Sequence, residues 1–268
     1  MRIVTLLTRM ENAPELIELT ARKAAALEAG VTLLYVREER LFELPIFGEE
    51  EPSLDGAREY LLAEVRKAGG ERWAVLAYDD DPVDHLLLEA EREKADLLIA
   101  GMEEDRERLI ARTRTPVLFP KAGTAHRCGK ALVVFDAAYS DDLCLPFVRK
   151  ALEAGEWSAY MDFQILPTMG TDLSLDPVVD TLATGLEVEQ ELKSIREKAF
   201  RELCEAEGME GYFEVGELGI AQDILSRAAV VEAECLAVIA EDHDTLLAES
   251  LGELAAEAKR DLLVCFQH

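Results

Sequence analysis

The sequence has few basic residues and no long apolar run. Lys and Arg number 28 against 55 Asp and Glu, which gives a formal net charge of −27. Such a field repels phosphate backbones, so we expect no nucleic-acid partner. No stretch approaches the roughly 20 apolar residues of a membrane span, and the N-terminus lacks the basic and apolar regions of a secretory signal. These absences favour a cytoplasmic protein without membrane insertion.

Paired cysteines and catalytic motifs are also missing. The five cysteines are scattered and never form a Cys-x-x-Cys pair, which fits a reducing compartment. Cys235 and Cys265 fall in expected buried strands, so we predict core residues rather than reactive thiols. We find no Ser or Cys nucleophile beside a general base, no Walker loop and no Cys/His zinc spacing. The sequence therefore predicts no catalytic residue and no resident metal.

What the sequence does contain is a repeated unit. Residues Asp79–Phe119 predict a helix, an apolar strand, a helix and a strand, and Gln222–Phe266 repeat that order. Strands that alternate with helices imply right-handed crossovers and a parallel sheet covered by helices on both faces. We therefore predict an α/β fold of two tandem doubly wound domains, at residues 1–122 and 129–268, each with a five-stranded parallel sheet flanked by helices.

Two insertions interrupt the repeat, at residues 37–54 and 167–185. The first reads as a loop that packs locally, with covering the mouth of a site or docking a partner as alternatives, and the second resists assignment. A long amphipathic helix follows, over roughly residues 186–207, and Gly208 is typical of a helix end. Its apolar stripe predicts a core face, with a partner groove as the alternative; the stripe consists of Leu192, Ile195, Ala199, Phe200 and Leu203.

The order of these elements resembles the universal stress proteins in their tandem, UspA-like form. The most specific segments are ADLLIAG and TPVLF in the first half and VVFDAAYSDD, at residues 133–142, in the second. The resemblance covers nearly the whole chain outside the insertions. It implies an open five-stranded parallel sheet in each half, of the adenine nucleotide α-hydrolase type, and two halves that mimic the homodimer of the family.

Members of the family that bind ATP or AMP resemble one another in a loop after the fourth strand, with the pattern Gly-x-x-Gly, nine residues, Gly-Ser/Thr. Glycine lets backbone amides reach phosphate oxygens. Here only fourteen residues separate Gly101 from Pro116, so the loop is deleted. Glu103, Glu104 and Asp105 stand where phosphates would lie, and like charges 4 Å apart repel by about 4 kcal/mol at an effective dielectric near 20.

The second half departs less from the nucleotide-binding pattern. Ala240 replaces the first Gly, four residues EDHD follow it, and Ser250 keeps the terminal hydroxyl. The Asp that nucleotide-binding members have after the first strand is Thr8 in one half and Asp136 in the other. The resemblance thus implies that any nucleotide contacts Asp136, Ala137, Ala240 and Ser250. Capping of the following turn is the alternative role for Asp136.

Two acidic clusters offer metal sites as alternatives. Asp79–Asp81 follow an expected strand, where three carboxylates could hold Mg²⁺. Asp81 also precedes Pro82, which is typical of a helix N-cap. Asp242–Asp244 and Glu249 could ligate a transition metal, but consecutive residues rarely converge on one ion. We expect helix capping and solvation instead of metal binding.

These observations favour a non-enzymatic, cytoplasmic stress-response or regulatory protein whose nucleotide-binding loops are degenerate. It would act through contacts with protein partners, and a homodimer is one such contact. The alternative is an ATP- or AMP-binding sensor, or a weak nucleotidase, that uses Mg²⁺ and a site in the second domain. A regulator that depends on a divalent metal is a third hypothesis.

Overall fold

The computed structural model describes residues 1–37, 53–102, 104–121, 128–136, 144–163, 179–216, 219–240 and 245–266; side chains at 179–189 are not described. Most of both insertions therefore lies outside the described residues, and their predicted roles stay predictions.

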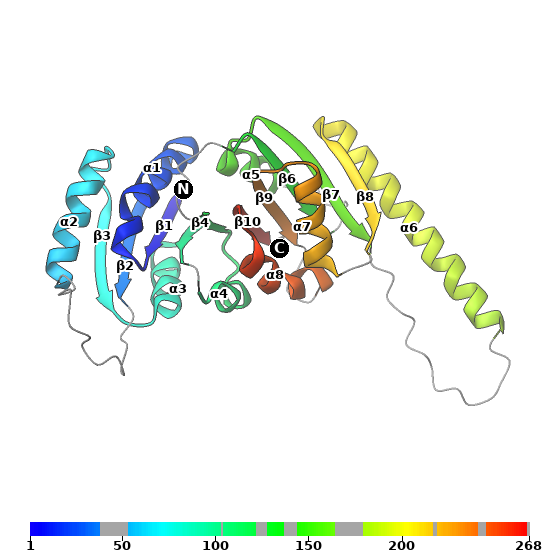
Figure 1. Ribbon diagram of the computed structural model, residues 1–268, viewed down its shortest axis with the longest axis horizontal. Coiled ribbons are helices and arrows are strands. Elements are labelled where there is room, and N and C mark those ends of the chain that lie inside the picture. The colour runs from blue at the N-terminus through cyan, green and yellow to red at the C-terminus, as the bar shows by residue number, and fades with distance from the viewer. Residues whose placement is uncertain are drawn as a thin grey trace, which may run out of the picture.

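Strands and helices alternate along the described chain (Figure 1). The strands are β1 Arg2–Leu7, β2 Gly30–Arg37, β3 Ala74–Asp79, β4 Leu97–Gly101, β5 Val117–Phe119, β6 Lys130–Phe135, β7 Glu156–Phe163, β8 Glu210–Val215, β9 Cys235–Ala240 and β10 Asp261–Phe266. The helices are a short 3₁₀ turn η1 Met10–Asn12, then α1 Ala13–Leu27, α2 Leu54–Lys67, α3 Pro82–Glu93, α4 Arg106–Arg112, α5 Cys144–Leu152, α6 Val179–Glu207, α7 Ile220–Val230 and α8 Leu246–Glu257.

The strands form one sheet in the order β3-β2-β1-β4-β5-β10-β9-β6-β7-β8. Each half repeats the doubly wound order 3-2-1-4-5 with parallel neighbours, which confirms the predicted fold class. The halves meet where β5 and β10 pair antiparallel, with Leu118 opposite Leu263. The boundaries at residues 122 and 129 stay a prediction, because the sheet runs through both halves.

The apolar core lies on both faces of this sheet. Alternate strand residues point to opposite faces, as Ile3 and Val4 do on β1, so each strand is covered twice and reads as a continuous apolar run. Side chains of α1, α2, α5 and α6 pack in one cluster and those of α3, α4, α7 and α8 in the other. Each cluster includes residues of both halves, and burial therefore stabilises the two halves together.

A buried lysine also joins the halves. Lys23 of α1 is 7% exposed, and its Nζ donates to the carbonyl of Leu152 and to Glu153, each at 3.3 Å, at the end of α5. Burial lowers the pKa of Lys23, and Glu153 only partly offsets it. The contact between the halves thus includes a buried lysine whose hydrogen-bond partners belong to the other half.

Several helix ends follow the predicted local chemistry. Asp81 caps α3 by accepting from the amide of Asp84 at 2.8 Å, with Pro82 in the first turn. Gly208 follows α6 at φ 64°, in the left-handed region that favours glycine. The predicted start of α6 is wrong, because the helix begins at Val179, within the segment that resisted assignment.

Only the C-terminal part of the predicted apolar stripe of α6 lies in the core. Phe200 is 1% exposed and Leu203 packs against the core. Leu192 and Ile195 lie about two turns before Phe200 and Leu203, respectively, and are 49% and 47% exposed. The apolar stripe of α6 therefore extends past the part of the helix that is buried against the sheet.

Candidate functional site

The fold has two switch points, between β1 and β4 and between β6 and β9, where the crossovers of neighbouring strands lead in opposite directions. In open α/β sheets a crevice forms there, outside the carboxyl ends of the strands, and ligands bind in it. These two places are therefore the candidate sites.

The first switch point is closed by direct contacts. The Thr8 hydroxyl donates to the carbonyl of Gly101 at 3.4 Å, across the ends of β1 and β4. A Cβ on Gly101 would lie 2.6 Å from the side chain of Leu16 and 3.0 Å from the carbonyl oxygen of Leu6. Met102, the next residue, is 6% exposed. The ends of β1 and β4 are thus in direct contact with each other and with α1.

The segment after β4 is anchored to the second half. Arg106, the first residue of α4, donates to the carbonyl of Met102 at 2.8 Å and to that of Ala255 in α8 at 3.1 Å. Its guanidinium lies 5.4 Å from the ring centre of Phe119. Asp105 turns the chain at φ 58° directly before α4. Arg106 therefore attaches the start of α4 to α8; the predicted deletion of the loop stays a prediction, because Glu103 lies outside the described residues.

The second switch point brings together two of the four predicted contacts. Asp136 follows β6, and its amide donates to the carbonyl of Ile239 at 3.2 Å. That bond and the register of β6 with β9 place Asp136 beside Ala240, which is fully buried. Ala137 and residues 241–244 lie outside the described residues. Asp136 and Ala240 therefore lie side by side at the ends of β6 and β9, as the resemblance implied.

Ser250 is placed differently from the expectation. It lies within α8, and its hydroxyl donates to the carbonyl of Leu246 at 2.9 Å, as serine does inside helices. The hydroxyl at the start of α8 belongs to Thr245, which accepts from the amide of Ala248 at 3.2 Å. Sequence reasoning missed Thr245, although Thr before an apolar helical run is a common N-cap signal.

Comparisons with known proteins identify a family for part of the chain. The Universal stress protein family model matches residues 1–115. The chain carries a universal stress protein domain in its first half. No curated protein matches the chain.

Solved structures share the fold of the whole chain. A functionally unknown protein from Pseudomonas aeruginosa superposes with a TM-score of 0.61 at 14% identity, covering 99% of this chain and 92% of that one. A universal stress protein from Archaeoglobus fulgidus superposes with a TM-score of 0.57 at 14% identity, covering 99% of this chain and 96% of that one. The second half, outside the family match, thus shares the architecture of the first.

The acidic strand end of the universal stress protein domain is engaged by the side chains of Arg37, His85 and Arg108. Asp79 receives two hydrogen bonds from Arg37, at 2.6 and 2.9 Å. Asp80 lies 3.0 Å from Nδ1 of His85, and Asp81 accepts from Arg108 at 2.6 Å. Among the described residues, no group of three His, Cys, Asp or Glu side chains is arranged to hold a metal. The Mg²⁺ alternative for Asp79–Asp81 therefore has no support.

The Asp81 carboxylate also ties α3 to α4. Burial alone would raise the pKa of Asp81, but the Arg108 hydrogen bond and the Asp84 amide outweigh it and lower the pKa. The same arginine reaches Asp84 at 3.1 Å, and Arg112 contacts Asp84 as well. This network fixes the short helix against α3 beside the closed switch point.

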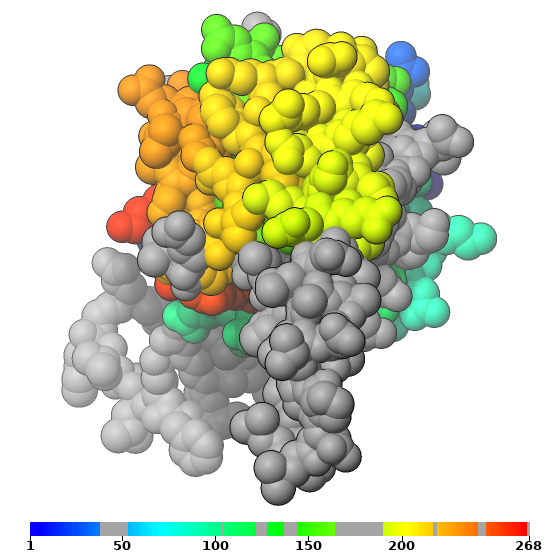
Figure 2. Space-filling view, turned by 90° about the vertical axis from the view of Figure 1, so that its right-hand side faces the viewer, coloured from blue at the N-terminus to red at the C-terminus, as the bar shows by residue number. Residues whose placement is uncertain are grey.

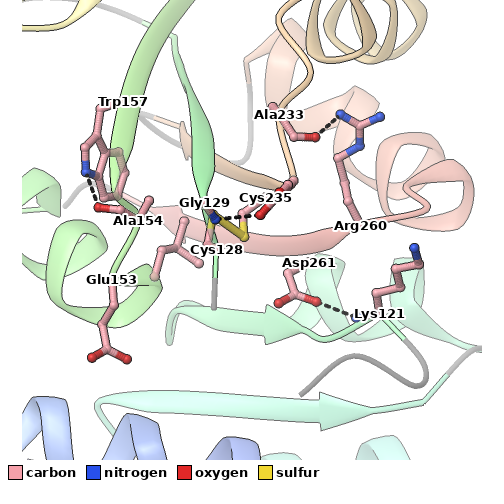
Figure 3. Close-up of a disulfide and its surroundings, with 12 residues drawn as sticks. Lys121, Cys128, Gly129, Glu153, Ala154, Trp157, Ala233, Cys235, Arg260 and Asp261 are labelled. Carbon is pink, nitrogen blue, oxygen red and sulfur yellow. Dashed lines mark hydrogen bonds between the residues drawn. A yellow bond between two sulfur atoms is a disulfide. The ribbon is translucent and has the colours of Figure 1, made fainter. Parts of the chain in front are cut away.

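A disulfide corrects the expectation of unpaired cysteines (Figure 3). Cys128, just before β6, is bonded to Cys235, the first residue of β9. Both are buried, at 6% and 3% exposure, so the predicted burial of Cys235 is confirmed. Cys265 is buried as predicted. Disulfides are rare in reducing compartments, so the cysteines no longer support a cytoplasmic location, which stays a prediction.

Within the described ranges, no helix combines the length and the apolar character needed to cross a membrane.

Proposed function

We propose that this chain is a non-enzymatic stress-response protein of the universal stress type that acts through protein contacts rather than through a bound nucleotide. The observation that carries the proposal is the closed switch point of the first half, where Thr8 bonds to Gly101 and Leu16 packs against it. A phosphate group needs several backbone amides that point into open space. The contacts of Gly101 with Thr8 and Leu16 leave its backbone packed against protein atoms, which supports the proposal, and Glu104 and Asp105 add negative charge beside it.

The alternative is a nucleotide sensor or weak nucleotidase in the second half. It is supported by one observation, the juxtaposition of Asp136 and Ala240 at the end of β6 and β9. A carboxylate in this position suits the hydroxyl groups of a ribose as a hydrogen-bond acceptor. Ser250 gives no support, because its hydroxyl is engaged inside α8.

A thermal-shift scan with ATP, ADP and AMP, each with and without Mg²⁺, tests the proposal. A ligand that binds only the native state stabilises it by about 2.7 kcal/mol at 100 times its Kd. We expect no shift with any nucleotide, and no release of phosphate from Mg·ATP above the buffer blank.

Two matched variants locate a site if a shift does occur. Asp136→Ala removes the candidate carboxylate, and Thr8→Ala alters the corresponding position of the first half. A Mg²⁺-dependent shift with ATP that Asp136→Ala abolishes would overturn the proposal in favour of the sensor. A shift that only Thr8→Ala abolishes would overturn it too, by placing a nucleotide at the first switch point.

A further inference from the structure

The long helix α6 extends past the sheet that it covers (Figure 1). Its 29 residues, at about 1.5 Å each, make a helix of about 43 Å. The 6 residues of its neighbour β8 span only about 20 Å. β8 is also the last strand of the sheet at this end. About half of α6 therefore has no strand beneath it.

The C-terminal half of α6 packs closely on the sheet. Phe200 and Cys204 are 1% and 5% exposed. A Cβ on Gly211 of β8 would lie 2.6 Å from the sulfur of Cys204, so helix and strand approach one another closely. This end holds the helix in place and fixes the direction in which the other end projects.

The apolar face continues where the strand support ends. Leu192 and Ile195 lie three residues apart, on one side of the helix, and both are about half exposed. Glu191 and Lys198 flank them and are exposed too. We call these four residues the α6 stripe. Figure 2 views the molecule from this side, with the described part of α6 in yellow to yellow-green on the surface.

We propose that the α6 stripe is a self-association surface, on which a second copy of this chain docks its own α6 in antiparallel orientation. The order of charges along the stripe selects this partner. An acidic residue precedes the apolar pair and a basic residue follows it. A twofold axis between Leu192 and Ile195 sets each leucine against the isoleucine of the other copy.

The same axis pairs opposite charges. Glu191 of each copy then faces Lys198 of the other, because the two positions flank the apolar seam on the same side of the helix pair. In a parallel pair, residues on this flank face the opposite flank of the partner helix, so Glu191 and Lys198 would not meet. Within the described residues, Lys198 has a long contact of 3.9 Å to Glu202, between side chains that are 77% and 67% exposed. Such a surface pair is weak and easily exchanged.

The total charge of the chain opposes association and sets the conditions of the test. Two chains of net charge −27 repel one another over long distances at low salt. At 0.15 M salt the Debye length is about 8 Å, which screens this repulsion while the close contacts of the stripe persist. The inference does not depend on the proposed function, because it involves neither switch point.

Sedimentation equilibrium of the full chain at this salt concentration, over a range of protein concentrations, tests the proposal. We expect a monomer–dimer equilibrium for the wild type. Glu191→Lys and Lys198→Glu should each weaken the dimer by about tenfold, because every dimer contains the contact twice. The double variant should restore it, since the charges are then exchanged but still complementary.

Exchanging the charges of residues 191 and 198 tests a contact between two chains and not one within a chain. Residues 191 and 198 are seven positions apart, about 10.5 Å along the helix, so they do not pair within one chain. Leu88→Glu, which changes a residue of α3 that is 57% exposed, is a matched control and should leave the dimer unchanged. A wild type that stays monomeric at every concentration would overturn the proposal and leave the stripe to an unrelated protein. A dimer that the double variant fails to restore would overturn it as well.

Discussion

The Cys128–Cys235 disulfide should contribute a large part of the stability of the oxidised chain. Its two residues are separated by 107 positions, so the bond closes a loop that contains most of the second half. In the chain-entropy account, a loop of about 100 residues constrains the unfolded chain by about 4.7 kcal/mol at 25 °C. Adding a reductant removes this constraint and changes no buried contact except the bond itself.

The expected effect can be measured as a change of melting temperature. An unfolding entropy of about 2.1 cal/mol/K per residue over 268 residues converts about 4.7 kcal/mol into a decrease of about 8 °C. Scanning calorimetry of the oxidised chain with and without a phosphine reductant measures it. A thiol titration of the denatured chain should count three thiols before reduction and five after it, because two of the five cysteines form the bond.

A Cys128→Ala variant is the control, since it has no bond to reduce. Its melting temperature should match that of the reduced wild type to within the cost of one small buried substitution, and it should not respond to the reductant. Equal melting temperatures for oxidised and reduced wild type, with the thiol counts as expected, would refute the loop-closure reasoning.

Two substitutions test other contacts. Asp81→Asn keeps a good N-cap for α3 but removes the carboxylate that Arg108 holds. Folding lowers the pKa of Asp81, so its carboxylate stabilises the folded chain above the unfolded pKa of about 3.9, and this stabilisation is lost as the pH falls through the folded pKa. The urea midpoints of variant and wild type should therefore differ at pH 7 and converge in acid. Phe119→Ala removes a fully buried ring from the central strand β5 and should lower the free energy of unfolding by about 3 to 5 kcal/mol. Tyr60→Ala, at a side chain that is 43% exposed on α2, should change it far less, and equal losses would contradict the assigned core.

Local features were largely predictable from the sequence. The strand Val117–Phe119 and the ends of two helices, at Asp81 and Gly208, were predicted correctly, because apolar runs, N-caps and left-handed glycines are determined by neighbouring residues. The start of α6 at Val179 was not, because the preceding segment lacks an apolar pattern.

Contacts between distant residues could not be predicted in this way. The pairing of Cys128 with Cys235 depends on β6 and β9 being neighbours in the sheet. The arginines that neutralise the acidic strand end come from β2 and α4, so the three carboxylates alone left a metal site open as an alternative to helix capping. Ser250 was selected by its distance from β9, whereas the start of α8 is determined by the Thr245 cap.

The two halves that meet where β5 pairs with β10 belong to one chain, so they do not have to be identical. In a homodimer built from one such domain, every substitution is made twice, and a residue that closes one switch point closes both. Here the two halves are joined within one chain but carry separate residues. Thr8 and Asp136 occupy corresponding positions, after β1 and after β6, and are different residues. A substitution that closes the switch point of one half therefore leaves the switch point of the other half unchanged.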